Sequence, residues 1–290
     1  MAGEAPVAGV VEAARGPGRL YPTMPPLRVV VHGATGRMGS ETLLALISDP
    51  DFVPVGAVGR TDRGNEFPLP DGSGTIPYAT SLDYLLARRQ ADVVVDFTNA
   101  QAAVAAAGAA GDRGAHLVTG SSGFSEGDIS KLRDASQRYQ IGIILAPNFA
   151  LGAVLLGYLA RIAARYFDYA DVSEAHHEAK IDAPSGTAIA LAKAISGEKK
   201  FTRPEPEKEP LAGTRGGDYN GVSIHSTRMP GRLAHHEVFF GAPGQTLSLR
   251  HDTLSRECYM PAVMLAIKDV VNRRELVMGL ESVLGLGQPG

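Results

Sequence analysis

The chain has 290 residues, of which 44% are hydrophobic and 20% charged, and its 28 Lys and Arg face 31 Asp and Glu. This composition is typical of a globular protein with one large or two medium domains, and it excludes a chain that is disordered throughout. The formal charge of −3 provides no basic excess for nucleic acid or an anionic membrane surface. The single Cys258 cannot form an internal disulfide. We therefore expect a cytoplasmic protein that binds neither nucleic acid nor membranes.

Residues 1–26 hold five Pro and four Gly without periodic apolar residues, which predicts an extension that contributes little to the fold. From Leu27 onward, short apolar segments alternate with helical patterns. Strands are predicted at residues 27–32, 53–58, 91–97, 116–119 and 142–145, and helices at 40–47, 99–111 and 126–139. This alternation predicts a doubly wound parallel sheet whose two faces are both covered by helices.

The pattern changes after Asn148. Helices are predicted at residues 151–165 and 187–194, a strand at 170–175, a long loop at 199–218, and alternating strands at 222–226, 236–240 and 246–251. We interpret the last three strands as an antiparallel meander with an open face suited to packing between subunits. A helix at 259–271 closes the chain. We therefore predict a dinucleotide-binding domain at 27–149, completed by 259–290, and an α+β domain for substrate binding and oligomerisation at 150–258.

A glycine-rich turn follows the first predicted strand and opens the first helix. Its spacing, Gly33-x-x-Gly36-x-x-Gly39, differs from the commonest dinucleotide fingerprint, G-x-G-x-x-G, because Ala34-Thr35 replaces the middle glycine position. Glycines at such a turn allow tight backbone geometry, close approach of a pyrophosphate and close packing of helix and strand. The context favours a dinucleotide site over a ligand-free turn.

The loop after the second strand bears on the choice of dinucleotide. An NAD site usually has a carboxylate about 20 residues after the glycine loop, and this position is Gly59. Arg60 and Arg63 lie where a guanidinium could hold a 2′-phosphate. We therefore expect NADPH as cofactor, with NADH used more weakly. The alternative is that both arginines are ordinary loop charges and that Asp62 replaces the missing carboxylate.

The segment from Glu174 to Ala188 carries the densest chemistry. It places two imidazoles, an ammonium group and a Ser-Gly-Thr turn at a predicted helix start within a few residues. A helix start with small hydroxyl residues suits a carboxylate, Lys180 adds a positive charge, and a histidine can donate a proton near neutral pH. These residues predict a site for a small anion that is protonated during a reaction.

Two other interpretations of this segment are possible. Glu174, His176 and Glu178 would share one face of a strand and could bind a metal ion. Other Cys or His residues at ligand spacing are lacking, however, and the Lys180 ammonium would repel a cation, so we expect no metal. A purely structural role for His176 and His177 is the second alternative.

The same residues carry a family resemblance. The stretch 174–188, Glu-Ala-His-His-Glu-Ala-Lys-Ile-Asp-Ala-Pro-Ser-Gly-Thr-Ala, resembles the signature of the 4-hydroxy-tetrahydrodipicolinate reductases, also called dihydrodipicolinate reductases. Further landmarks of that family follow in order at residues 33–39, 96–98, 120–124, 146–149, 221–226 and 260–261. The resemblance spans residues 27 to about 286. It implies a Rossmann domain joined to an α/β domain that assembles a homotetramer.

The resemblance also implies roles for individual residues. His176 would be the general acid and Lys180 a second catalytic group, whereas His177, Ser185, Gly186 and Thr187 would bind a small dicarboxylate substrate. The cofactor-binding set would be Gly33, Ala34, Thr35, Gly36, Arg37, Met38, Arg60, Phe97, Thr98, Gly120, Ser121, Ser122, Ala146, Pro147, Asn148 and Phe149.

Three positions depart from the family pattern. Gly59 replaces a frequent acidic residue, Ser121 and Ser122 replace the usual pair of threonines, and His236 stands where glutamine is expected. The predicted function is NAD(P)H-dependent reduction of 4-hydroxy-tetrahydrodipicolinate to tetrahydrodipicolinate in the diaminopimelate route of lysine biosynthesis. The alternatives are a related NAD(P)-dependent amino-acid or imine dehydrogenase and a non-catalytic NADP-binding regulator.

Overall fold

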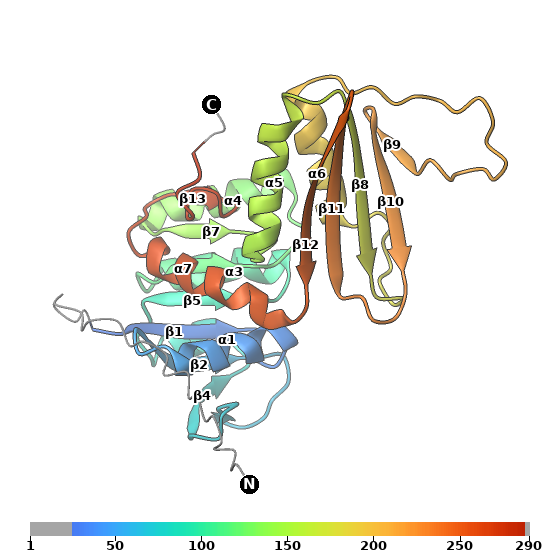
Figure 1. The fold of residues 1–290 in the computed structure, drawn as a ribbon. Coiled ribbons are helices and arrows are strands. Elements are labelled where there is room, and N and C mark those ends of the chain that lie inside the picture. The colour runs from blue at the N-terminus through green and yellow to red at the C-terminus, as the bar shows by residue number, and fades with distance from the viewer. Residues whose placement is uncertain (1–24, 288–290) are drawn as a thin grey trace, which may run out of the picture.

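The computed structural model describes residues 25–287, so nearly all of the extension predicted for residues 1–26 lies outside the described residues. Two sheets form two parts that meet at one side, with the strands of the first sheet lying crosswise to those of the second (Figure 1). The predicted fold class, a Rossmann-type doubly wound sheet plus a second α+β domain, is confirmed. Within residues 25–287, no helix is long and apolar enough to cross a bilayer.

The first sheet has eight strands in the order β13-β7-β6-β5-β1-β2-β4-β3, all parallel except β3, which pairs antiparallel with β4. The chain order reverses direction between β1 and β5, and ligands of doubly wound sheets bind at such a switch point. The strands are β1 (Leu27–His32), β2 (Phe52–Val58), β3 (Glu66–Pro68), β4 (Thr75–Ala79), β5 (Val93–Asp96), β6 (His116–Thr119), β7 (Ile143–Leu145) and β13 (Leu276–Met278).

Helices cover both faces of this sheet, as the uniformly apolar strands require. One face packs against α1 and α7, and the other against α2, α3 and α4. The helices are α1 (Arg37–Ser48), α2 (Leu82–Leu86), α3 (Ala100–Gly111), α4 (Glu126–Tyr139) and α7 (Met260–Val270), the last preceded by a 3-10 turn, η1 (Arg256–Tyr259). The C-terminal segment therefore returns to the first sheet, where Val263 and Ile267 are fully buried.

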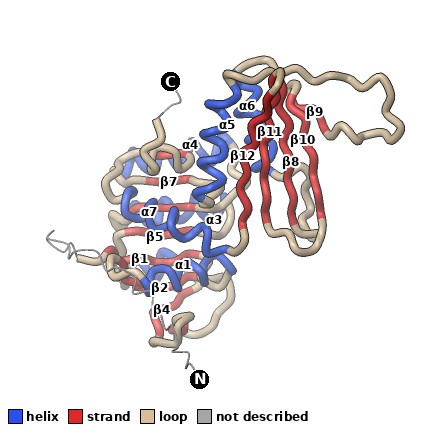
Figure 2. The backbone as a smooth tube through the Cα atoms, viewed as in Figure 1, coloured by secondary structure: helices blue, strands red, loops and turns tan. Residues whose placement is uncertain are grey.

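The second sheet has five strands in the order β12-β11-β8-β10-β9. Its elements are α5 (Leu151–Ala164), β8 (Tyr169–His176), α6 (Gly186–Glu198), β9 (Gly217–Tyr219), β10 (Val222–Arg228), β11 (Ala234–Ala242) and β12 (Gln245–Thr253). Helices α5 and α6 pack on one face, around Val172 and Val238. The secondary-structure tube shows no helix on the other face within the described residues (Figure 2), and Tyr169 and Phe239 are exposed there.

The antiparallel meander predicted for the last three strands is wrong. Strand β8 lies between β10 and β11, running parallel to β10 and antiparallel to β11, and only β11 and β12 form a hairpin. A central strand pairs with a neighbour on each of its two edges. Strand β8 takes that position in the second sheet, and every second residue of it is buried. This insertion brings the end of β8 beside the ends of β10 and β11.

Candidate active site

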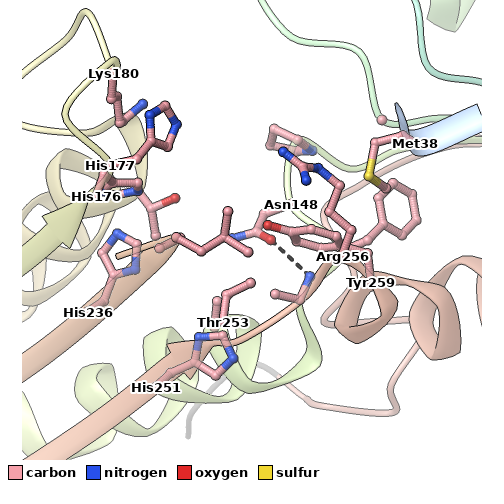
Figure 3. Close-up of a pocket in the computed structure, with 18 of the residues that line it drawn as sticks. Met38, Asn148, His176, His177, Lys180, His236, His251, Thr253, Arg256 and Tyr259 are labelled. Carbon is pink, nitrogen blue, oxygen red and sulfur yellow. Dashed lines mark hydrogen bonds between the residues drawn. The ribbon is translucent and has the colours of Figure 1, made fainter. Parts of the chain in front are cut away.

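A cleft of about 400 Å³ lies between the carboxyl end of the first sheet and the ends of β8, β11 and β12. In Figure 3, His176, His177, Lys180 and His236 lie on one side, and Met38 and Tyr259 on the other. The predicted residues that line it are His176, His177, Lys180 and Thr187 from the second part of the chain and Met38, Phe97, Gly120, Pro147, Asn148 and Phe149 from the first. The cleft thus joins the predicted substrate residues to part of the predicted cofactor set.

His176 is the last residue of β8, and its ring is held by Glu174, two residues earlier on the same face of the strand. The ring Nδ1 lies 2.5 Å from Oε2 of the fully buried Glu174 carboxylate. Because an ionised carboxylate only accepts hydrogen bonds, Nδ1 must carry the proton of this contact. The other ring nitrogen, Nε2, is not used in this contact. Because His176 lines the cleft, Nε2 is the ring atom that could donate a proton to a substrate there.

The electrostatics of this pair follow from burial and from Arg228. Burial alone would raise the pKa of Glu174, but hydrogen bonds from Arg228, Ser226 and His176 outweigh it and lower the pKa to about 2. Burial also lowers the pKa of His176, an effect that the hydrogen bond to Glu174 opposes without cancelling. The pair therefore consists of a permanent carboxylate and an imidazole that gives up its second proton readily.

A second imidazole lies beside the first. The rings of His176 and His236 meet edge to face with centroids 5.3 Å apart. Burial, together with the charge of His176, lowers the pKa of His236 to about 4. The ring is therefore neutral at pH 7 and shares a 3.2 Å hydrogen bond between Nε2 and the hydroxyl of Ser185. Sequence reasoning noted the departure at His236 but did not find this position beside His176.

Lys180 and His177 lie in the loop that follows β8. His177 is the first residue after the strand and is exposed, so a strand that ends at His176 frees both histidines to reach the cleft. The Lys180 ammonium forms a 2.6 Å ion pair with Asp182 and remains partly exposed. An anionic ligand in the cleft could therefore take the place of this exposed carboxylate at the ammonium.

The start of α6 forms the floor of this region. Ser185 caps the helix by accepting a hydrogen bond from Ala188 N–H, and its own N–H donates to Glu174. The hydroxyl and the N–H of this buried residue are thus both engaged within the protein, and its predicted role in substrate binding stays a prediction. Gly186 and Thr187 follow in the first turn, and apart from its chain neighbours and its own helix backbone, no atom of the described residues lies within 4 Å of where a Cβ on Gly186 would stand. Their amide groups belong to the first turn of α6, where N–H groups lack partners within the helix and suit a carboxylate.

The glycine loop fits a dinucleotide. Gly33 has a φ of +88°, and a Cβ on it would stand 2.7 Å from the carbonyl oxygen of Phe97. A Cβ on Gly39 would stand 2.3 Å from the carbonyl oxygen of Gly33, so helix α1 packs directly on the turn. Helix α1 has no side-chain cap at Gly36, and its exposed N-terminal turn can therefore receive phosphate oxygens. Ala34 is fully buried, and its N–H donates to the Val58 carbonyl at 3.0 Å.

A buried carboxylate supports the neighbouring loops. Asp96, at the end of β5, accepts hydrogen bonds from the hydroxyls of Thr98, Thr119 and Ser121 at 2.6, 2.8 and 2.7 Å. The Ser121 hydroxyl also accepts from Thr98 N–H. Ser121 and Thr98, both predicted cofactor residues, thus use their side chains to fix two loops to each other, whereas Ser122 is exposed.

The aromatic residues of the predicted cofactor set pack together at the cleft. Phe97 and Phe149 meet edge to face at 5.9 Å, and a Cβ on Gly120 would overlap the Phe97 ring. Ala146 and Phe149 are buried, whereas Pro147 is exposed and Asn148 partly so. The loops after β5, β6 and β7 therefore form one side of the cleft, which is lined by the apolar rings of Phe97 and Phe149.

Arg60 and Arg63 lie outside the cleft, on the loop after β2, and both are exposed. No ion pair within the described residues engages either one. The Asp62 carboxylate accepts a hydrogen bond from Gly64 N–H within the same loop. A Cβ on Gly59 would stand 2.8 Å from Thr35 Cγ2 and 2.6 Å from Tyr78 Oη. Arg60 therefore follows a residue in contact with the glycine loop.

Sequence reasoning missed several residues of the cleft. His251 and Thr253 come from β12, and Arg256 and Tyr259 from η1 (Figure 3). The predicted return of the C-terminal helix to the first domain could have indicated them. The chain that leads into that helix must cross the boundary between the two parts, where the cleft lies. Arg256 adds a guanidinium to the side of the cleft opposite Lys180.

Comparisons with known proteins agree with this geometry. The family model "Dihydrodipicolinate reductase, N-terminus" matches residues 27–149, and "Dihydrodipicolinate reductase, C-terminus" matches residues 152–284. A 4-hydroxy-tetrahydrodipicolinate reductase from Dehalococcoides mccartyi is 47% identical over 263 residues, covering 91% of this chain and 100% of the relative. The dipicolinate-bound dihydrodipicolinate reductase of Paenisporosarcina sp. TG-14 is 34% identical with a TM-score of 0.80, covering 89% and 99% of the two chains. GenD2 from gentamicin A biosynthesis, solved with NAD, shares the fold at 17% identity, with a TM-score of 0.61 and 93% of each chain covered.

Proposed function

Because the chain belongs to the dihydrodipicolinate reductase family, we propose that it reduces 4-hydroxy-tetrahydrodipicolinate to tetrahydrodipicolinate with NADPH, in the diaminopimelate route of lysine biosynthesis. The observation that carries this proposal is the cleft between the two sheets. It places an imidazole with a fixed tautomer and an ammonium group opposite the loops of a dinucleotide fold. The dipicolinate bound to the Paenisporosarcina relative supports a small dicarboxylate as the ligand.

The residues of the second part have two roles toward the substrate, which are carboxylate binding and proton donation. Lys180 and the amide groups of Gly186 and Thr187 bind substrate carboxylates, and His177 contributes from the same loop. His176 supplies from Nε2 the proton that the ring carbon requires after the 4-hydroxyl leaves as water. Holding the reactants in one orientation provides most of the barrier lowering, and a positioned acid adds about 10²- to 10⁴-fold.

The residues of the first part would hold the dinucleotide. The Gly33–Met38 turn and the uncapped start of α1 fit a pyrophosphate, and the wall formed by Phe97, Gly120 and Asn148 fits a flat ring. A bound reduced nicotinamide would supply the hydride for the reduction. Glycine at the positions where a Cβ would meet backbone oxygens is the observation that supports this fit.

The preference for NADPH over NADH rests on the loop after β2. Gly59 provides no carboxylate to accept hydrogen bonds from a ribose, and Arg60 is exposed beside the glycine loop. A guanidinium can bind a 2′-phosphate through two parallel hydrogen bonds. Arg60 is therefore the residue that distinguishes the two cofactors.

We also propose a homotetramer in the cytoplasm. The face of the second sheet that carries Tyr169 and Phe239 is free of helices within the described residues, and both side chains are about two-fifths exposed. A sheet face with large exposed aromatic residues is suited to packing against a second copy.

One assay tests the function. The substrate is formed in situ from pyruvate and aspartate semialdehyde by the condensing enzyme, and loss of the reduced-nicotinamide absorbance is followed after the chain is added. Turnover that requires both precursors supports the proposal. Oxidation of NADPH with an open-chain imino acid instead would favour the related dehydrogenase, and NADPH binding without turnover would favour the regulator.

A further inference from the structure

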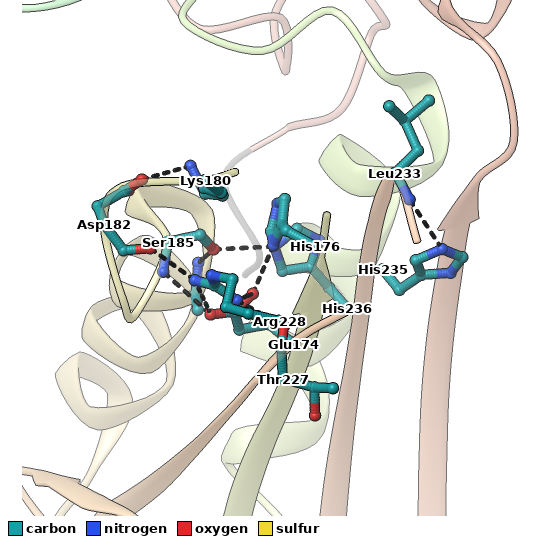
Figure 4. A network of polar contacts seen from close by, with 11 residues as sticks. Glu174, His176, Lys180, Asp182, Ser185, Thr227, Arg228, Leu233, His235 and His236 are labelled. Carbon is teal, nitrogen blue, oxygen red and sulfur yellow. Dashed lines mark hydrogen bonds and ion pairs between the residues drawn. The ribbon is translucent and has the colours of Figure 1, made fainter. Parts of the chain in front are cut away.

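Arg228 ends β10 and occupies a central position in the polar network behind the cleft (Figure 4). It pairs in register with His176 on β8. All four of its terminal N–H groups are used. Nη1 donates to Glu174 Oε2 at 2.9 Å and to the Thr227 carbonyl at 2.8 Å, and Nη2 donates to Glu174 Oε1 at 2.8 Å and to the Asp182 carbonyl at 2.6 Å. One guanidinium thus contacts two different segments of the site.

The first segment leads to the general acid. Glu174 accepts two hydrogen bonds from Arg228, one from Ser185 N–H and one from His176 Nδ1. Together with the hydrogen bond from Ser226, these donors engage both carboxylate oxygens, and the carboxylate has no exposed surface. Because Arg228 binds both carboxylate oxygens, the direction in which the carboxylate presents Oε2 to the imidazole depends on the guanidinium.

The second segment leads to Lys180. Its ammonium pairs with the Asp182 side chain, and the Asp182 carbonyl is bound by Arg228. The surrounding loop is mostly exposed, including Ile181, which has no contact that shields it. Within the described residues, the Arg228 bond is the one hydrogen bond that joins residues 177–184 to a different segment. The position of Lys180 therefore also depends on this guanidinium.

We propose that Arg228 is a positioning residue that sets His176, through Glu174, and Lys180, through Asp182, at a fixed separation across the substrate site. This inference rests on the proposed function, because it assigns the acid and the anion-binding ammonium to those two residues. Arg228 itself is not among the residues that line the cleft. A lysine could not replace it. The planar guanidinium binds both oxygens of Glu174 and the Asp182 carbonyl at once, and a single ammonium group lacks that fork of donors.

The charges around His176 make the test specific. Those that face the ring are Glu174 from its own strand, Arg228 from β10, Lys180 from the loop and the neutral His236 ring from β11. Replacing Arg228 with glutamine leaves the Glu174 charge uncompensated, which raises the pKa of His176. Replacing Glu174 with glutamine removes the attraction itself, which lowers that pKa. The two substitutions therefore shift the same titration in opposite directions.

The experiment compares Arg228→Gln and Glu174→Gln with the wild type and with Arg161→Gln. Arg161 pairs with Glu198 between α5 and α6, in the same part of the chain but not in the cleft, so it reports the cost of losing an ion pair there. For each variant, kcat and its pH profile, the affinity for dipicolinate and the His176 titration by imidazole NMR are measured.

We expect Arg228→Gln to lower kcat about 10²-fold, to weaken dipicolinate binding several-fold and to raise the His176 pKa. Glu174→Gln should lower kcat and the His176 pKa while dipicolinate affinity changes less, because the Arg228 bond to Asp182 persists. If Arg228→Gln does not fold, Arg228→Lys replaces it and should show the same losses in kcat and dipicolinate affinity at smaller size.

The inference is overturned if the arginine variant behaves like Arg161→Gln in kcat and dipicolinate affinity, or if both site variants move the His176 titration in the same direction. A wild type without reductase activity would overturn the proposed function instead. In that case the NMR titration and dipicolinate binding still decide whether Arg228 positions both groups.

Discussion

Glu174 and His176 stand two residues apart on β8 and hydrogen-bond through Oε2 and Nδ1 at 2.5 Å. Side chains at alternate positions of a strand share a face, so the local backbone itself brings them together. The low pKa of Glu174, about 2, keeps the carboxylate an acceptor across the working pH range. The pairing therefore leaves one ring nitrogen, Nε2, for proton transfer.

Replacing His176 with glutamine should remove this transfer. We expect His176→Gln to lower kcat by about 10²-fold or more and to leave the affinity for NADPH close to that of the wild type. Steady-state kinetics and fluorescence titration with NADPH measure the two quantities. His225→Gln, on the open face of the second sheet, is the matched control. Near-wild-type kcat in the His176 variant would remove this residue from the acid role.

The pH dependence of the reaction should reveal the same group. Burial lowers the pKa of His176 below its usual value of 6.5, and only the doubly protonated ring can donate a proton. The value of kcat/KM, which reports the free enzyme, should therefore fall as pH rises through a pKa below 6.5.

Bound substrate should shift this titration. The two carboxylates of the substrate favour the imidazolium, so the corresponding pKa in the kcat profile should be higher than in the kcat/KM profile. Measuring both profiles on one preparation provides the comparison. Identical pKa values in the two profiles would contradict a titrating group that faces the substrate.

The second imidazole, His236, should make the protein sensitive to acid. Its pKa falls from 6.5 in the unfolded chain to about 4 in the folded protein. Between these values the unfolded chain binds the extra proton, so the free energy of unfolding decreases as pH falls from 6.5 to 4, by at most about 3 kcal/mol. His236→Gln should lose less stability over that range. Urea unfolding at pH 7 and pH 4.5 measures the difference, and equal losses in both proteins would contradict it.

Much of this fold could be predicted from the sequence because its signals are local. Residues close together in the chain are enough to indicate the apolar strands β1 and β5 and the Gly33–Gly39 turn. The same holds for the short segment that follows His176. The order of strands in the second sheet could not be predicted the same way. Pairing of β8 between β10 and β11 depends on contacts between segments far apart in the chain.

The same distinction applies to the site. His176 and Lys180 lie in one short segment, whereas the arginine that joins them is 54 residues from Glu174 along the chain. An arginine in a strand has no sequence pattern that indicates a buried carboxylate partner. The contact between Ser185 and His236 could not be predicted for a similar reason, since this hydrogen bond joins residues 51 positions apart.

The proposed tetramer can be tested on the open sheet face. Phe239 is 40% exposed there and pairs in register with Asp171 of β8. Phe239→Lys should place a charge in the subunit interface and reduce the tetramer to smaller species, while Asp171 can neutralise it within one subunit. Light scattering measures the mass, and Tyr84→Lys on α2 is the exposed control. A wild type that is monomeric at micromolar concentration would exclude the tetramer.

A carboxylate cannot simply be introduced at Gly59 to test cofactor choice. Its Cβ would stand 2.6 Å from Tyr78 Oη, and this hydroxyl donates a hydrogen bond to the Thr61 carbonyl at 2.5 Å. Gly59→Glu should therefore displace the loop and weaken both cofactors rather than favour NADH. The informative position is the next one along the chain.

Arg60→Ala should erase most of the preference for NADPH. We expect the wild type to show kcat/KM at least about tenfold higher with NADPH than with NADH, which corresponds to about 1.4 kcal/mol. A guanidinium that binds only the 2′-phosphate cannot affect NADH, so the variant should raise KM for NADPH alone. Arg63→Ala tests the neighbouring charge, and Arg113→Ala, an exposed arginine outside this loop, is the control. Equal weakening of both cofactors by Arg60→Ala would mean that Arg60 holds part of the dinucleotide common to both, and cofactor choice would then have to be assigned to another residue.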